Sequence, residues 1–356
     1  MPTRSSRPDH ALRLDAAQVI VAVRSLLEAQ GVPSGDAELI ADSLVAADLW
    51  GHQSHGVLRL PWYIDRLRAG SMTARTEPAI VSDTGPLLVM DGRDGIGQVL
   101  AERARTEAVR RAHEFGVAAV GVRNSNHFGT AMYFTRRAAA EGCVGILTTN
   151  ASPAMAPWGG REKAVGTNPW SVAAPFGDRV VVVDVANTAV ARGKIHLAKQ
   201  RGDSIPETWA LGRDGNPTSD PAEAVDGVIL PMAGHKGYAI AFMMDVLSGA
   251  LTGSEVGTGV HGPYEPTARS GAGHLFLAID VSAAGSMAEY TERVGRIVSE
   301  VTSVPPAEGH ARVLYPGEVE DRHRQAALEA GGLDLPQRTI DALRRIAHED
   351  GVVLPF

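Results

Sequence analysis

The sequence contains a single cysteine, Cys143, among its 356 residues. No disulfide can form within the chain, which is typical of a protein from a reducing compartment, so we expect a cytoplasmic location. Cys143 begins the apolar run of residues 143–147. This setting favours a buried structural residue over a reactive nucleophile.

Long apolar segments and blocks of like charge are also missing. The most apolar stretch, residues 238–247, is too short to span a bilayer, and the polar residues 1–10 lack the apolar core of a signal peptide. The 41 acidic and 34 basic residues are mixed along the chain and give a formal net charge of -7. This distribution disfavours a nucleic-acid-binding surface and a polybasic membrane patch, so neither nucleic acid nor membrane is expected as a partner.

The apolar pattern that is present predicts helices at both ends of the chain and mixed structure between them. Apolar residues recur at helical spacing over residues 15–70, with Ser34 as a candidate cap of the second helix. From residue 78 to 185, short β-type runs alternate with helical stretches. A further apolar helix is expected over 236–252, and the tail from 319 to 350 is expected to be helical.

This order of elements predicts an α/β (α+β) fold with two domains. With 44% apolar residues, the chain is long enough to bury a sizeable core. Helical ends around an α/β middle indicate a helical outer domain that holds an inserted α/β domain. The expected outer domain comprises residues 1–74, 232–262 and 303–356, and the inserted domain comprises residues 75–231 and 264–302.

One glycine-rich segment imitates a nucleotide-binding fingerprint. Residues 257–262 match the pattern G-x-G-x-x-G, which in a Rossmann fold joins a buried strand to a helix whose N-terminus holds a pyrophosphate. Here the glycines follow a helical stretch and lead into Pro263. We therefore expect a glycine-rich loop, and any dinucleotide must be bound by other means.

The first cluster of chemically useful residues is Ser54, His55 and Arg59. A hydroxyl beside an imidazole, followed by a guanidinium, can supply a proton donor, its orienting partner and a carboxylate clamp. Histidines at a helix bend can equally serve as caps or face solvent, so residue types alone leave this function open. No metal site is expected, because His52 and His55 are three residues apart with no carboxylate nearby on the same face.

Three further clusters carry weaker signals. The polar loop 123–130 leads from an expected strand to a helix near residue 131, and free backbone N–H groups at such a junction suit a phosphate, although His127 could instead be structural. Glycine turns within residues 159–169 allow close approach of a ligand, as ordinary turns also do. Lys236 lies in the first turn of the apolar helix, where the helix dipole disfavours a cation, so a ligand anion suits it better.

At these places the sequence resembles a known family. It is similar to the malate/L-lactate dehydrogenases that are distinct from the Rossmann-type enzymes and that include ureidoglycolate and sulfolactate dehydrogenases, diketogulonate reductase and the piperideine-2-carboxylate/pyrroline-2-carboxylate reductases. The likeness extends over nearly the whole chain from about residue 12. The matching segments are GHQSHGVLRLPWYIDRLRAG from Gly51, VRNSNHFGTA from Val122, TNASPAMAPWGGREKAVGTNPWSVAAP from Thr149, VVDVANTAVARGKI from Val182, PMAGHKGYAIAFMMDVLSGALTG from Pro231 and RVLYPGE from Arg312.

The resemblance implies roles for individual residues. Ser54 and His55 match the family's catalytic pair, with His55 as proton donor in reduction and acceptor in oxidation, favoured because Ser54 and Arg59 flank it. Some relatives assign the catalytic base to the histidine equivalent to His127, and the sequence leaves the two assignments open. The implied substrate contacts are Arg59, Thr167, Arg192 and Gly193. The implied cofactor contacts are His127, Phe128, Gly129, Thr130, Ala131, Asp184, Val185, Ala186, His235, Lys236, Arg312, Gly317 and Glu318.

The resemblance also implies a reaction and an assembly. The expected fold is the non-Rossmann malate/lactate dehydrogenase-like one, with the inserted domain binding the cofactor. The expected reaction moves a hydride between NAD or NADP and the alpha carbon of a small 2-hydroxy or 2-oxo acid, such as malate, lactate, sulfolactate or a ureidoglycolate-like acid. A homodimer is expected.

Two other functions stay open. Some imine-reducing relatives have a carboxylate at the position of Lys194, where it completes a Ser-His-Asp relay. The lysine therefore disfavours the first alternative, an NADPH-dependent reductase of cyclic imino acids (piperideine-2-carboxylate or pyrroline-2-carboxylate). The second alternative is a catalytically idle member that binds a metabolite. Joint retention of the candidate site residues argues against it: Ser54, His55, Arg59, His127 and Lys236.

Overall fold

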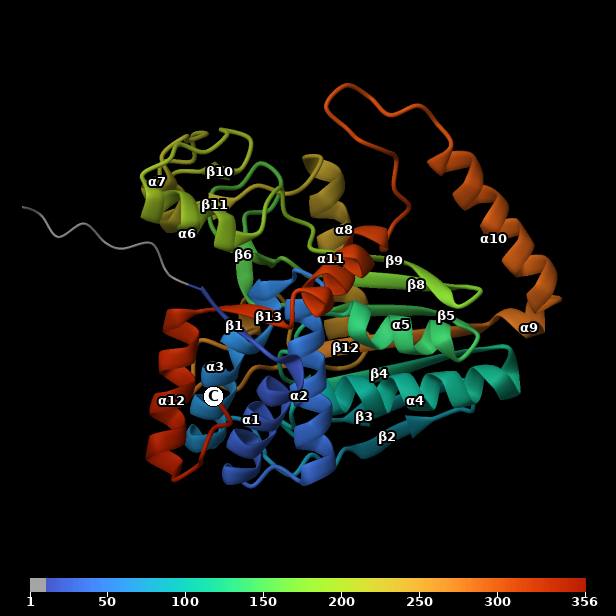
Figure 1. Ribbon diagram of the computed structural model, residues 1–356, viewed down its shortest axis with the longest axis horizontal. Helices are drawn as coiled ribbons and strands as arrows, with labels where there is room; N and C mark the ends of the chain where they lie inside the picture. Colours follow the sequence, from blue (N-terminus) through green and yellow to red (C-terminus); the bar gives the residue numbers. More distant parts are fainter. Residues whose placement is uncertain (1–10) are drawn as a thin grey trace, which may run out of the picture.

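The computed structural model describes residues 11–356, and the two ends of that range meet in one helical layer (Figure 1). Helices α1 and α2 pack together, and the C-terminal helix α12 packs against α1 and α3. The short strand β1 pairs antiparallel with β13, which ties the start of the described chain to its end. The bounds are β1 Ala11–Leu14, α1 Ala16–Ala29, α2 Ser34–Leu49, α3 Leu60–Ala69, β13 Leu333–Pro336 and α12 Gln337–Asp350.

The predicted helical spacing of this layer is confirmed, but the predicted cap is wrong. Buried residues recur along α1 at Val19, Val23 and Leu26, which face the core of the layer. Ser34 is the first residue of α2, and its side chain makes no capping bond. Pro33 occupies the cap position instead, because its fixed φ of -59° with ψ of 144° already directs the chain into the helix.

A second correction concerns the tail, where a continuous helical region was predicted over residues 319–350. The structure has helix α11 (Glu318–Glu329), then strand β13, then α12. Gly331 and Gly332 end α11, with φ angles of 90° and 134°. A Cβ atom at Gly332 would stand 1.9 Å from the carbonyl oxygen of Leu14, so only glycine lets β13 approach β1.

The centre of the molecule is a seven-stranded sheet with the order β2-β3-β4-β12-β5-β8-β9. Only the β3–β4 pair is parallel, so this sheet has a topology unlike that of a doubly wound parallel sheet. The bounds are β2 Ala79–Asp83, β3 Leu87–Asp91, β4 Val117–Ser125, β5 Cys143–Thr149, β8 Trp170–Phe176, β9 Arg179–Val185 and β12 Ala272–Asp280.

Helices α4 (Gly97–Phe115) and α5 (Met132–Ala140) pack against this sheet and bury its second core. Strand β12 alternates accordingly: Phe276 and Ala278 belong to this core, whereas Leu277 and Ile279 point to the opposite face. Cys143 is buried, as predicted.

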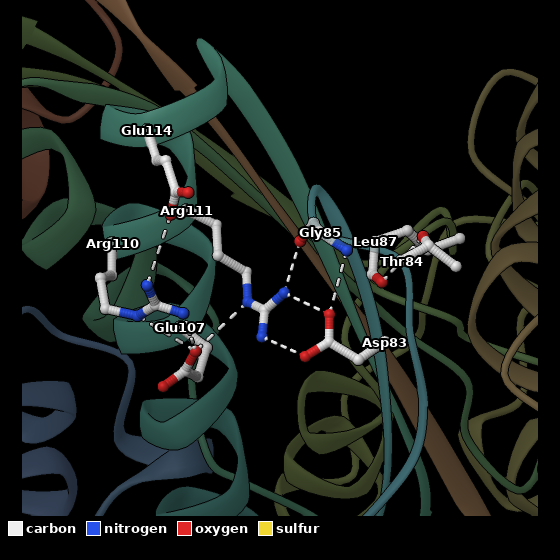
Figure 2. A network of polar contacts seen from close by, with 8 residues as sticks. All are labelled: Asp83, Thr84, Gly85, Leu87, Glu107, Arg110, Arg111 and Glu114. Atoms are coloured by element: carbon white, nitrogen blue, oxygen red, sulfur yellow. Dashed lines mark hydrogen bonds and ion pairs between the residues drawn. The ribbon is translucent and has the colours of Figure 1, made fainter.

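The outer end of α4 is fixed to the β2–β3 hairpin by charge (Figure 2). Arg111 donates to both oxygens of Asp83 at 2.6 and 2.8 Å and also to the carbonyl of Gly85. Glu107 accepts from both Arg110 and Arg111. Bidentate pairing of this kind fixes orientation as well as distance, so it fixes the position of the β2–β3 hairpin relative to α4.

A smaller four-stranded sheet with the order β10-β11-β6-β7 carries two helices and a small core of its own. Its elements are β6 Pro153–Met155, β7 Val165–Gly166, α6 Arg192–Arg201, β10 Ala210–Leu211, α7 Pro221–Asp226 and β11 Val228–Ile229. The apolar helix predicted over 236–252 is present as α8 (His235–Asp245), which continues into a π-helical turn at Val246–Ala250.

The glycine-rich residues 257–262 contain a short 3-10 turn, Gly257–Gly259, after which β12 begins at Ala272. The next element after this segment is a strand and not a helix, so the prediction of a loop rather than a Rossmann turn is confirmed. After α9 (Val281–Ala284) comes α10 (Met287–Thr302), which extends away from the rest of the chain (Figure 1). Across residues 11–356, every helix is too short or too polar to cross a bilayer.

Candidate active site

Four of the predicted residues lie together where the helical layer meets the central sheet. The Oγ atom of Ser54 is 2.9 Å from Nδ1 of His55, and Nε of Arg59 donates to the carbonyl oxygen of Ser54 at 2.6 Å. The rings of His55 and His127 stack with centroids 5.8 Å apart and an interplanar angle of 18°. A hydroxyl, two imidazoles and a guanidinium are therefore gathered within a few ångströms.

Local backbone constraints place Ser54 and His55. Two 3-10 turns, Gln53–His55 and Val57–Arg59, connect α2 to α3. The buried carboxylate of Asp48, near the end of α2, accepts from the N–H of Val57 at 2.8 Å. A Cβ atom on Gly56 would stand 2.2 Å from Oδ1 of Asp48, so glycine is needed for the turn to pass this carboxylate.

The electrostatic setting keeps both histidines uncharged. Burial lowers the pKa of His55 to about 3, and the positive charges of Arg59 and His52 act in the same direction. Burial also lowers the pKa of His127 well below its ordinary value, and His55 and Arg59 add to the effect. At neutral pH the protein therefore presents two neutral imidazoles beside a guanidinium.

The loop that carries His127 is held by the end of β9. Oδ2 of Asp184 accepts from the Thr130 hydroxyl at 2.6 Å and from the first backbone N–H of α5, at Met132, at 2.8 Å. His52 lies 3.3 Å from the same Thr130 hydroxyl and 3.5 Å from Glu320 of α11. Strand β9, helix α5 and helix α11 are thus joined around one loop.

Other residues of the predicted cofactor segments have structural contacts. Phe128 is buried, with its ring 4.7 Å from that of His274, so its side chain belongs to the core. Val185 ends β9, and the exposed Ala186 follows it. Gly129 has a φ of 82°, a conformation that glycine adopts without strain, and Ala131 is buried before α5.

The remaining predicted residues lie on other elements. Arg192 and Gly193 open α6, and His235 and Lys236 open α8; all four are exposed. The half-buried Thr167 follows β7, and its carbonyl accepts from the N–H of Asn187. Among the described side chains, none of these groups hydrogen-bonds to Ser54, His55 or Arg59.

The two ends of the segment 312–318 are joined by an ion pair. Arg312 pairs with Glu318, which Arg322 also contacts, so both predicted residues already have partners. Gly317 precedes α11 with a φ of 95°. The N–H of Val182 donates to the carbonyl oxygen of Pro316, which places this segment along β9.

Several site residues were missed from the sequence. The hydroxyl of Tyr63 is 2.7 Å from Nδ1 of His127. The guanidinium of Arg59 lies 4.1 Å from the ring centre of Trp62. Tyr63 is four residues beyond Arg59, and this helical spacing could have drawn attention to it. Within residues 11–356, no group of three or more His, Cys, Asp or Glu side chains is placed to hold a metal ion.

Residues 14–344 match the sequence profile of a family described as malate/L-lactate dehydrogenase. The chain belongs to the malate/L-lactate dehydrogenase family. The family predicted from the sequence is therefore confirmed, and with it the enzyme class, a dehydrogenase.

Solved and curated members of the malate/L-lactate dehydrogenase family agree with this assignment. The structure of sulfolactate dehydrogenase from Methanocaldococcus jannaschii superimposes with a TM-score of 0.92 at 38% identity, covering 96% of this chain and 98% of that one, which confirms the predicted fold. A (2R)-3-sulfolactate dehydrogenase (NADP(+)) from Chromohalobacter salexigens is 38% identical over 90% of this chain and 94% of its own length. A ureidoglycolate dehydrogenase (NAD(+)) from Escherichia coli O157:H7 is 36% identical over 90% and 93%.

Proposed function

We propose that this protein is an NAD- or NADP-dependent oxidoreductase that moves a hydride to or from the alpha carbon of a small 2-hydroxy or 2-oxo acid. The observation that carries the proposal is the cluster of Ser54, His55 and Arg59 with the His127 ring stacked beside it. Its relatives, which are named for sulfolactate and ureidoglycolate, support acids of that size.

Arg59 is proposed to bind the substrate carboxylate. Its Nε is already committed to the Ser54 carbonyl and its planar group lies over Trp62, so its orientation is fixed before any ligand arrives. A pre-set guanidinium suits a planar anion, because both can pair through two parallel hydrogen bonds.

His55 is proposed to move the proton on the substrate oxygen. Ser54 contacts Nδ1, which leaves Nε2 of the ring for the substrate. The neutral ring can accept the hydroxyl proton in oxidation. A bound carboxylate offsets the charge of Arg59, which raises the pKa of His55 and favours the protonated ring that reduction needs.

The residues around this cluster fit a nicotinamide cofactor. Gly129 lies beside His55, and a Cβ there would meet only the His55 carbonyl at 3.6 Å and the Gln98 amide at 4.0 Å, so the loop backbone is open toward the histidines. We propose that His127–Ala131 and Asp184–Ala186 hold the cofactor, with His235 and Lys236 at the start of α8, where exposed cationic and backbone N–H groups suit a phosphate. When bound, the nicotinamide accepts or supplies the hydride.

The test is a matrix of activities and variants. Wild-type protein is assayed with both cofactors against malate, lactate, sulfolactate, ureidoglycolate and piperideine-2-carboxylate. His55→Ala is expected to lower kcat about 100-fold or more, because a positioned acid-base group is lost, with little change in cofactor affinity. Arg59→Met is expected to raise the KM for the acid instead.

The exposed His261 provides the matched control, because His261→Ala removes an imidazole that lies in an ion pair with Glu265. Unchanged turnover by His55→Ala would overturn the proposal. Turnover of the cyclic imine alone would favour an imino acid reductase, against which the exposed Lys194 argues. No turnover with any acid or imine would favour an idle metabolite-binding member.

We also propose a cytoplasmic homodimer. The buried Cys143, whose thiol pKa is raised by burial to about 11, is an inert thiol suited to a reducing compartment. A dimer is supported by apolar residues that face away from α4 and α5 on the central sheet, such as Val117 and Ile279, exposed by 48% and 39%. The two residues are partners in the register of β4 and β12, and exposed apolar side chains that adjoin in this way are found at subunit contacts.

A further inference from the structure

Tyr63 and His127 meet across two elements that are 64 residues apart in the chain. The tyrosine belongs to α3 and the histidine to the loop after β4. Nδ1 of His127 has two neighbours: the Tyr63 hydroxyl at 2.7 Å and the backbone N–H of Gly129 at 3.3 Å. A backbone N–H can only donate, so this long contact favours a lone pair on Nδ1, and a neutral ring with that lone pair carries its proton on Nε2.

The Tyr63 hydroxyl reinforces this arrangement. Burial raises the pKa of Tyr63 well above its ordinary value, although Arg59 and the Gln98 amide oppose the effect. The hydroxyl therefore keeps its proton, and because the Gly129 N–H favours a lone pair on Nδ1 of His127, the hydroxyl donates to that lone pair. Two donors converge on one nitrogen, and both disfavour the tautomer with a proton there.

His55 is held differently. Within the described part of the chain, its Nδ1 hydrogen-bonds only with the Ser54 hydroxyl, which can either donate or accept. This contact is compatible with a neutral ring that has a free lone pair on Nε2 and also with the charged ring. His55 can thus gain and lose a proton without breaking its support, whereas His127 cannot do so at the same nitrogen.

We infer that Tyr63 is a positioning residue that fixes His127 as the Nε2–H tautomer, so that His127 donates a hydrogen bond to the substrate oxygen and proton transfer is left to His55. This inference rests on the proposed function. In oxidation, the hydroxyl proton passes to Nε2 of His55, the electron pair of the C–H bond leaves as hydride to the cofactor, and a C=O bond forms. His127 keeps its proton throughout and stabilises the developing charge on that oxygen.

The first test reads the tautomer without any turnover. The full-length protein carries 15N-labelled histidine, and the His127 signals among its 12 histidines are assigned by their loss in His127→Gln. At neutral pH we expect a protonated Nε2 and an unprotonated Nδ1 in His127. The reverse tautomer, or a charged ring, would overturn the inference even if the enzyme turns over a hydroxy acid.

The second test separates a donor from an acid-base group. Glutamine can donate through its amide but cannot exchange a proton, so His127→Gln should retain at least tenfold more kcat than His127→Ala. His55→Gln should be as impaired as His55→Ala. If glutamine fails to rescue position 127 and rescues position 55 instead, the roles are reversed.

The third test removes one hydroxyl. Tyr63→Phe should lower kcat about tenfold with the KM for the acid within about twofold, and it should mix the tautomers of His127. Tyr133→Phe is the matched control, because the buried Tyr133 hydroxyl donates to Asp42, away from the histidines. A pure His127 tautomer in Tyr63→Phe would remove Tyr63 from the inference. Absence of turnover by wild-type protein would refute the proposed function, whereas the spectrum would still decide the tautomer.

Discussion

At the scale of single residues, the site combines two neutral histidines with one fixed guanidinium. Burial lowers the pKa of both imidazoles, and the nearby charge of Arg59 adds to the effect, so both rings are neutral at neutral pH. We propose that Arg59 is instead the group that attracts the acid. An arriving carboxylate therefore changes the charge balance around His55 at the moment when proton transfer is needed.

Asp48 gives a prediction for the dependence of stability on pH. Burial raises its pKa to about 7, although the Val57 N–H opposes the shift. The folded state therefore binds a proton that the unfolded state releases near pH 4, so the contribution of Asp48 to stability is full below that pH and is lost as pH rises toward 7. Asp48→Asn keeps an acceptor for Val57 and cannot ionise. Its stability relative to wild type should rise between pH 4 and 7 by up to about 1.4 kcal/mol per pH unit.

Urea unfolding at pH 5 and pH 7 measures this difference. The exposed Asp65 on α3 supplies the control, since Asp65→Asn should track wild type at both pH values. Parallel pH dependences for Asp48→Asn and wild type would refute the assignment of a protonated, buried Asp48.

At the scale of secondary-structure elements, the loop 126–131 depends on β9 for its shape. Asp184 accepts from Thr130 and from the start of α5, which lacks a side-chain cap of its own at Ala131. The Asp184 carboxylate of strand β9 therefore acts as the N-terminal cap of helix α5. A displacement of Asp184 on β9 would therefore remove hydrogen bonds that fix the segment that we propose to hold the cofactor.

Asp184→Ala should consequently affect both stability and cofactor binding. Loss of a cap costs about 1–2 kcal/mol, and the freed loop should raise the KM for the nicotinamide cofactor more than the KM for the acid. Thermal unfolding and steady-state kinetics give the two readings. Asp220→Ala is the matched control, because Asp220 caps α7 through the Ala222 N–H. An equal rise in cofactor KM for both variants would contradict the special role of Asp184.

At the scale of the whole molecule, α10 is only weakly packed against the rest of the described chain. None of its residues is buried, and it touches the rest of the chain mainly at β8 and α9. Its apolar residues form one stripe: Tyr290, Val294, Ile297, Val298 and Val301. The side chain of Ile297 is 61% exposed. Exposure of apolar surface to water is unfavourable, so we expect a second subunit to bury this stripe.

The double variant Ile297→Asp/Val301→Asp should therefore shift the proposed dimer toward monomer, because it places charges in the apolar stripe. Light scattering after size-exclusion chromatography measures the mass. Ser299→Asp adds a charge on the opposite side of α10 and should leave the dimer intact. A dimer that survives the double variant would show that α10 lies outside the contact.

Much of the fold followed from local pattern. The helices of residues 15–70 and the central-sheet strands between residues 79 and 185 appear where apolar spacing placed them, because burying one face of an element imposes a period on its own sequence. Strand β13 was missed, since its four residues are too few to show a period and its place is set by pairing with β1. The division into two domains stays a prediction.

By itself, the sequence determined the family and the adjacency of Ser54 and His55, because neighbours in a chain remain neighbours in the fold. Only the tertiary structure decided that the His55 and His127 rings stack, that Asp48 supports the turn and that Tyr63 reaches Nδ1 of His127. Hydrogen bonds and pKa shifts depend on distances through space and on the exclusion of water. The spacing of residues along the chain determines neither those distances nor the access of water.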